Sequence, residues 1–134
     1  MRPPAPRPCS SCPYRRDVPS GVWALEEYEK LPEYDGPTYG QAAGAFQCHQ
    51  QDARLCAGWV GCHDMEQSLA FRLLARSGAL ADEEVEAVLD YTTDVPLFAS
   101  GAEAAAHGLR ELEAPGADAR RVIGRLRRKT GRQA

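Results

Sequence analysis

The placement of cysteine constrains this chain more than any other feature of its sequence. All five cysteines and two of the three histidines lie between residues 9 and 63. The 71 residues after position 63 contain no cysteine and a single histidine, His107. Such clustering in a short chain indicates either a metal site or a set of disulfides.

Two features favour a metal site. The first eight residues, MRPPAPRP, have prolines where a signal peptide needs an apolar run, so we expect a cytoplasmic protein whose thiols stay reduced. The odd number of cysteines suits four ligands and one spare residue better than a set of bridges. No stretch approaches 18 consecutive apolar residues, so we expect no transmembrane helix and no membrane partner.

The predicted ligands come from two parts of the chain. Two cysteines separated by two residues can turn both sulfurs toward one ion, and the segment Cys9-Ser-Ser-Cys12 supplies such a pair. The later cysteines must supply the other half, with looser spacing. The predicted metal ligands are Cys9, Cys12, Cys48 and Cys56.

The remaining candidate groups receive supporting roles. His49 adjoins Cys48, and neighbouring residues do not readily bind one ion together, so we expect His49 beside the site. Cys62 is the expected spare cysteine. Four thiolates around a divalent ion carry a net charge of −2, and Arg15 and Arg16 are placed to offset it.

The identity of the metal stays open between zinc and iron–sulfur. Pro13 follows Cys12, as a proline follows a ligand cysteine in the ferredoxin motif. No third cysteine lies close to the first pair, however, and ferredoxin spacing is absent. Zinc is therefore the leading interpretation and a [4Fe–4S] cluster is the alternative.

Three motifs carry a resemblance to a known family. Residues 7–17 read RPCSSCPYRRD, residues 46–49 read FQCH, and residues 56–59 read CAGW. Together they resemble an uncharacterised family of small actinobacterial and actinophage proteins, whose signature is PC-x-x-CP-aromatic-R-x-D, F-x-CH and C-x-G-aromatic. That family has no established activity, so the resemblance supports the four-cysteine set and implies no function.

Outside the motifs, the spacing of apolar residues predicts helices over residues 23–31, 64–78, from about 82 to 91, from 100 to about 114, and over 117–129. Residues 32–44 read as a loop and residues 45–48 as a short strand. We therefore expect a mainly α fold, with a small irregular cysteine-stapled metal-binding half packed on a helical half. One domain is predicted, with a flexible leader (1–8), a cysteine motif region (9–63) and a helical region (64–130).

The apolar spacing also predicts which residues of these helices face the core, and the caps that bound them. Asp64 and Gln67 are the expected cap of the second helix, Gly78 its end, and Ser100 the cap of the fourth. The residues expected to face inward are Trp23, Leu25, Tyr28 and Leu31, then Met65, Leu69, Leu73 and Leu74, then Val85, Val88 and Leu89, and then Ala102, Ala105, Leu109 and Leu112.

Charge is distributed unevenly along the chain. The net charge of −3 combines an acidic body, residues 21–119 with a sum of −13, and a C-terminal segment, residues 120–134 with a sum of +7. The last helix is predicted to dock through Val122, Ile123 and Leu126. Its outer face carries Arg120, Arg121, Arg125, Arg127 and Arg128.

Two partners compete for this basic face. We favour the acidic body of the same chain, because no aromatic residues interleave with the arginines and the rest of the molecule would repel DNA. A nucleic-acid backbone is the other candidate.

No nucleotide-binding or hydrolase motif is present, and four thiolates suit a closed structural site, so we do not expect an enzyme. The leading hypothesis is a metal-stapled module that binds an unknown protein partner. The alternative is an iron–sulfur redox or sensing protein, such as a regulator that binds nucleic acid through its C-terminal helix. A fainter likeness to the WhiB-type iron–sulfur regulators lies in Cys12-Pro13 and in residues 21–23, which read GVW, although the cysteine order differs.

Overall fold

The computed structural model describes residues 1–129, and this part of the chain is mainly helical and contains no β-sheet. Isolated bridges join Arg2 to Arg54, Arg15 to Leu97 and Gln47 to Leu55. The elements in order are α1 (Leu25–Glu29), η1 (Leu31–Tyr34), η2 (Thr38–Gly40), α2 (Ala57–Cys62), η3 (Met65–Gln67), α3 (Leu69–Ser77), α4 (Asp82–Leu89), α5 (Gly101–Leu109) and α6 (Ala117–Lys129). The predicted fold class, mainly α, is confirmed.

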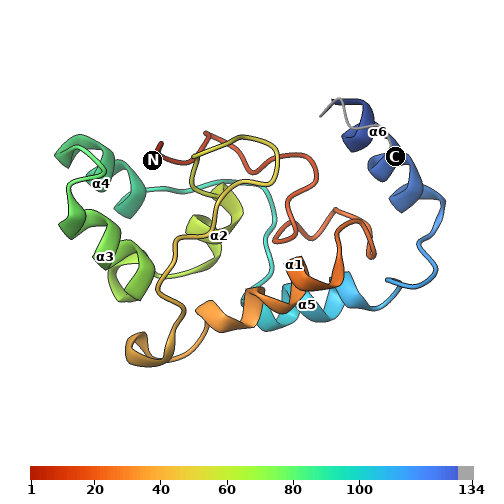
Figure 1. The fold of residues 1–134 in the computed structure, drawn as a ribbon, viewed down its shortest axis with the longest axis horizontal. Coiled ribbons are helices and arrows are strands. Elements are labelled where there is room, and N and C mark those ends of the chain that lie inside the picture. Colours follow the sequence, from red (N-terminus) through yellow and green to blue (C-terminus); the bar gives the residue numbers. More distant parts are fainter. Residues whose placement is uncertain (130–134) are drawn as a thin grey trace.

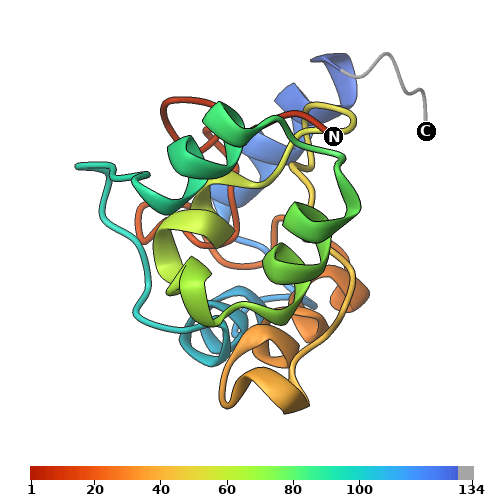
Figure 2. The same cartoon turned by 90° about the vertical axis from the view of Figure 1, so that its left-hand side faces the viewer.

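The helices are spread along the longest axis of the molecule. Helices α3 and α4 lie at one end and α6 lies at the other, with α2 between them (Figure 1). Helices α1 and α5 pack side by side, and α5 also contacts η1. The view turned by 90° again places α3 and α4 together, with α6 behind them (Figure 2). No helix within residues 1–129 is both long and apolar enough to cross a bilayer.

One large core joins the cysteine region to the helical region. It contains Cys12, Tyr14 and Trp59 from the first half together with Val88 and Ala104 from the second. Trp59 and Tyr14 are completely buried. The aromatic side chains of the cysteine region therefore supply the hydrophobic area on which α4 and α5 pack.

Helix α6 packs through a smaller cluster of its own. Ala119 and Val122 are buried against Val18 and Val22, and Ile123 and Leu126 pack at the edge of this cluster. The predicted docking face of the last helix is confirmed.

The helix predicted over residues 64–78 is broken at Ser68. The Asp64 carboxylate caps only η3, by accepting from the Glu66 amide, and the Ser68 hydroxyl accepts from the Phe71 amide to begin α3. The break resets the helical phase, so Phe71 is buried while Leu73 is 47% exposed. The prediction that Leu73 faces inward is wrong. The predicted end at Gly78 is confirmed by its left-handed φ of 80°.

The faces of α4 and α5 also differ in part from the predicted ones. Helix α4 begins at Asp82 as predicted and buries Val88, but Leu89 is 43% exposed. The Ser100 hydroxyl caps α5 as predicted, by accepting from the Glu103 amide. Small side chains let α5 approach α1 and η1 closely, and Ala102 is turned outward. The buried residues of α5 are Gly101, Ala104, Ala105 and Gly108.

The first helix is shorter than predicted, because α1 begins at Leu25 and Leu25 itself is 43% exposed. Tyr28 is the residue that fixes this helix. Its hydroxyl accepts from the amides of Val22 and Trp23, at 3.0 Å each, and its side chain is 1% exposed. Two backbone donors at the start of α1 thus depend on one buried oxygen.

Removing that oxygen is expected to destabilise the protein. Tyr28→Phe leaves two poorly solvated amides without an acceptor, which costs about 1–3 kcal/mol of unfolding free energy. Tyr39→Phe is the matched control, because Tyr39 is 89% exposed. Chemical denaturation of both variants checks this, and equal midpoints would contradict the role of the Tyr28 hydroxyl.

The N-terminal leader is tied to the body of the protein. The Arg2 amide donates to the Ala53 carbonyl at 2.6 Å, and the Arg2 carbonyl accepts from the Leu55 amide at 3.0 Å. Pro8 is buried and Met1 packs against the core. The segment predicted as a flexible leader, residues 1–8, thus makes defined contacts, because Arg2 pairs through its backbone with residues 53–55. The strand expected over 45–48 is reduced to the single Gln47–Leu55 bridge.

Candidate functional site

The first pair of cysteines is presented by two consecutive tight turns. The Cys12 amide donates to the Cys9 carbonyl at 3.0 Å, and the Arg15 amide donates to the Cys12 carbonyl at 3.0 Å. The Trp23 indole nitrogen donates to the Ser11 carbonyl at 2.7 Å and holds this loop from the side. Cys12 is completely buried, and Cys9 is partly buried.

The second pair comes from a hairpin-like return of the chain. The Cys48 amide donates to the Arg54 carbonyl at 2.8 Å, and the Cys56 amide donates to the Phe46 carbonyl at 2.9 Å. These bonds place Cys48 and Cys56 on paired segments although seven residues separate them in sequence. Cys56 is also the N-cap of α2, where its sulfur accepts from the Trp59 amide at 3.4 Å.

The fold brings these four cysteines together as a thiol quartet, Cys9, Cys12, Cys48 and Cys56. The Cys12 and Cys56 sulfurs are 3.8 Å apart, and the Cys9 thiol interacts with the thiols of both Cys12 and Cys48. The order of neighbours is Cys48, Cys9, Cys12, Cys56, and the direct sulfur–sulfur contact among them is that of Cys12 with Cys56. The quartet is not a closed cage, because residues 1–129 hold no group of three or more Cys, His, Asp or Glu side chains already arranged to hold an ion.

Every sulfur of the quartet faces a backbone amide. The Gln50 amide donates to the Cys48 sulfur at 3.4 Å, as the Trp59 amide does to Cys56. The amides of Ser11 and Tyr14 face the Cys9 and Cys12 sulfurs and act to lower the pKa of each thiol. An amide hydrogen bond favours the ionised form of its acceptor. These amides act in favour of the thiolate form at Cys9, Cys12 and Cys48, although they are not the largest influence on any of the three thiols.

The thiols nevertheless oppose one another's ionisation. Interaction with Cys12 raises the pKa of Cys9 to about 11, and interaction with Cys56 raises the pKa of Cys12. Interaction with Cys9 likewise raises the pKa of Cys48. Crowded, partly buried thiols stay neutral at pH 7 unless a cation offsets their charge. A soft divalent ion is the kind of cation that thiolates bind.

Gly58 makes the close approach of α2 to Cys12 possible. A Cβ atom at this position would overlap the Cys12 sulfur and lie 2.8 Å from the Tyr14 Cβ. The glycine of the C-x-G-aromatic motif is thus required by packing against the quartet, and the following Trp59 anchors α2 in the core.

Of the two arginines expected near the thiols, only one lies there. Arg15 donates to the Pro8 carbonyl at 3.0 Å and pairs with Asp17 at 2.7 Å, with 16% of its side chain exposed. Arg16 instead lies over the Phe98 ring, 5.1 Å from its centroid, and donates to the Leu97 carbonyl. The expectation for Arg16 is wrong because the chain turns toward α5 after Arg15.

His49 packs beside the quartet. Its Nε2 lies 2.6 Å from a Glu27 carboxylate oxygen, and its ring centroid is 4.5 Å from that of Trp23. Burial lowers the pKa of His49, and the Glu27 charge partly opposes this effect.

Cys62 lies at the end of α2, apart from the quartet. Burial, together with the charges of Asp35 and Glu103, raises the pKa of its thiol to about 12. Cys62 and His63 line a cavity of about 300 Å³ that sequence reasoning did not single out. A thiol held neutral beside acidic side chains is poorly suited to act as a nucleophile.

Comparison with known proteins identifies the family and nothing more specific. The model of a family of unknown function, DUF6283, matches residues 4–127, and the chain belongs to this family. No curated protein matches the chain, and no solved structure matches it. The predicted resemblance is therefore confirmed as far as membership of an uncharacterised family.

Proposed function

We propose that this member of the family DUF6283 is a non-enzymatic binding module stapled by one zinc ion on Cys9, Cys12, Cys48 and Cys56. The observation that carries the proposal is the thiol quartet, in which four sulfurs adjoin and each faces a backbone amide. Gly58 adds support, because a glycine, which has no side chain, lies at the point where α2 meets the Cys12 sulfur.

The spacing of the sulfurs favours a single ion over a cluster. Tetrahedral coordination with zinc–sulfur bonds of about 2.3 Å separates neighbouring sulfurs by about 3.8 Å. The Cys12 and Cys56 sulfurs are 3.8 Å apart. A [4Fe–4S] cluster binds each thiolate to a different iron and needs the sulfurs farther apart.

A zinc ion held by four thiolates has no open coordination position, which suits a structural role better than catalysis. It would tie together residues 9–56, where only five residues, those of α1, are α-helical. Reduced thiols are required, so we place the protein in the cytoplasm. An actinobacterial or actinophage origin remains a prediction from the motifs.

Metal analysis of the purified protein tests this proposal. We expect about one zinc per chain in the wild type and little zinc in Cys48→Ser, because three thiolates bind the ion much more weakly. Cys62→Ser is the matched control and is expected to keep the zinc, since Cys62 lies outside the quartet.

The same preparations decide between the two metals. A brown protein that contains iron and sulfide after anaerobic purification would replace zinc by an iron–sulfur cluster on the same cysteines. Full metal content in Cys48→Ser, or loss of metal from Cys62→Ser, would overturn the ligand set.

A further inference from the structure

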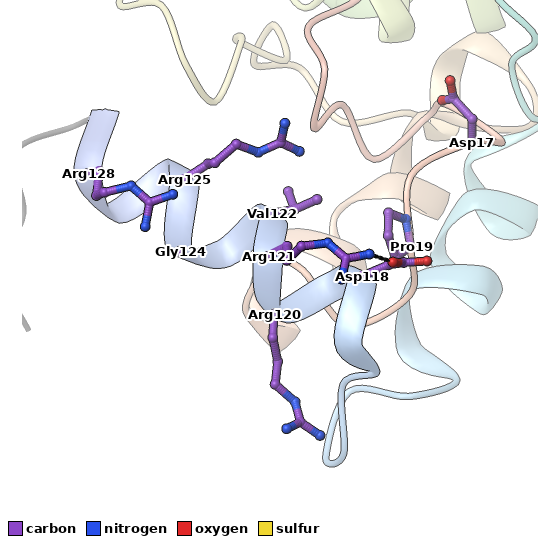
Figure 3. A pocket seen from close by; sticks show the side chains of 9 residues that line it. All are labelled: Asp17, Pro19, Asp118, Arg120, Arg121, Val122, Gly124, Arg125 and Arg128. Carbon is purple, nitrogen blue, oxygen red and sulfur yellow. Dashed lines mark ion pairs between the residues drawn. The ribbon is translucent and has the colours of Figure 1, made fainter.

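Helix α6 borders a groove of about 550 Å³ whose lining is rich in arginine (Figure 3). The other wall is the turn that carries Asp17 and Pro19. The side chains of Arg125 and Arg128 lie apart from the one carboxylate of α6, that of Asp118, which is drawn beside Arg121. The basic residues that line the groove are Arg120, Arg121, Arg125 and Arg128.

The basic face of α6 points to solvent because the opposite face of the helix packs against the body of the protein. Because Ala119 and Val122 are buried against Val18 and Val22, the arginines on the opposite side face solvent. No large apolar residue of α6 is exposed, so the helix offers no apolar face to a bilayer or to a helical peptide.

The acidic body, residues 21–119, leaves two of these arginines without an ion pair. Arg121 pairs with Asp118 of α6 itself, and Arg125 and Arg128 form no ion pair with any residue in the described range 1–129. Helix α4, with four acidic residues, lies at the opposite end of the molecule (Figure 1). The prediction that the acidic body holds the basic face is therefore wrong for Arg125 and Arg128, whereas Arg121 does pair with Asp118, a residue of the acidic body.

We propose that this groove binds the phosphate backbone of a nucleic acid. The proposal deepens the proposed function by naming the partner class of the binding module. Arg121, Arg125 and Arg128 follow one face of α6, with rises of about 6 and 4.5 Å between successive residues. A guanidinium group binds a phosphate through two parallel hydrogen bonds. A row of such groups matches a row of phosphates.

The fold weakens the objection that the acidic body would repel a polyanion, because the four acidic residues of α4 lie far from α6. A duplex seated along α6 meets the basic end of the molecule, while the acidic residues of α4 lie at the far end. Exposed charges farther apart than about 8 Å are largely screened at physiological salt. The lining of the groove carries charged side chains and no aromatic residue on which a base could stack, so binding is expected to be independent of the DNA sequence.

Fluorescence anisotropy with a short labelled DNA duplex of mixed sequence tests the proposal. The double variant Arg125→Gln/Arg128→Gln removes the two arginines that lack an ion pair. Arg72→Gln/Arg76→Gln is the control, since it removes the same charge from exposed positions of α3. We expect wild type and control to bind with a salt dependence that the groove variant largely loses. The slope of log affinity against log salt should fall by about 0.9 for each phosphate contact removed.

The proposal is overturned if the wild type does not bind the duplex at about 50 mM salt, or if both double variants lose affinity equally. It is also overturned if the salt slope of the groove variant is unchanged, or if a polyglutamate peptide binds more tightly than the duplex. The last result would assign the groove to an acidic protein segment. Zinc content is measured on the same samples. If the protein binds DNA but contains no metal, the zinc proposal fails and the groove proposal stands. If it contains zinc but does not bind DNA, the groove proposal fails and the zinc proposal stands.

Discussion

Removing the proposed zinc with a strong chelator is expected to unfold the cysteine region while leaving most of the helical signal. The apparent binding free energy of a structural zinc is about 10–16 kcal/mol at pH 7, as large as the whole stability of a typical domain. Without the ion, four thiols with raised pKa values crowd the centre of residues 9–56. The loops that hold the Tyr14 and Trp59 side chains in the core would then no longer be fixed.

Two tryptophans make this loss measurable. Trp59 follows Cys56 in α2, and the Trp23 indole is bonded to the Ser11 carbonyl between the first two cysteines. Chelation is therefore expected to shift the tryptophan emission to longer wavelength. The far-ultraviolet circular dichroism should fall only in part, since α3 to α6 lie outside the site.

Adding zinc back should restore the emission, and Cys62→Ser should behave as the wild type does. Cys12→Ser should resemble the chelated protein from the start, because its sulfur is completely buried in the centre of the quartet. A protein shown to be free of metal but with unchanged emission and melting temperature would contradict a structural role for zinc.

Gly58→Ala is the second substitution expected to have a large effect. Helix propensity alone predicts a gain of about 1 kcal/mol from replacing glycine by alanine inside α2. Packing predicts the opposite, because the new Cβ overlaps the Cys12 sulfur and crowds Tyr14. Overpacking a dense core costs about 1–3 kcal/mol or more, so the variant should be less stable and should hold zinc less tightly.

Gly44→Ala provides the control for this substitution. A Cβ at Gly44 meets no atom within 4 Å, and its φ is not positive, so alanine fits there without strain. Thermal melting and competition for zinc with a coloured chelator compare the two variants. A Gly58→Ala protein as stable as Gly44→Ala would show that α2 can move away from the thiols without cost.

Local rules account for the parts of the fold that the sequence predicted well. The start of α4 at Asp82, the cap at Ser100 and the end of α3 at Gly78 each depend on a residue and its near neighbours. The same holds for the apolar stripe of α6, whose spacing is that of a helix with one buried face. Clustering alone led to the predicted ligand set Cys9, Cys12, Cys48 and Cys56, of which the structure places the Cys12 and Cys56 sulfurs 3.8 Å apart.

Tertiary contacts decided the rest. Helix α2 escaped prediction because Gly58 and Gly61 disfavour a helix locally, and burial of Trp59 outweighs that preference. Leu73 is exposed because the break at Ser68 resets the helical phase, and Leu89 is exposed because α4 turns Val88 toward the core instead.

For the same reason, the sequence could not predict how far apart the acidic and basic residues lie in the fold. The sum of the charges along a chain does not give the distances between the charged groups, so the acidic body and the basic helix were predicted to interact. The fold places α4 and α6 at opposite ends, and Coulomb interaction between exposed groups falls off within about a Debye length. Sequence determined which side chains α6 carries, and the tertiary structure determined that Arg125 and Arg128 have no ion-pair partner within residues 1–129.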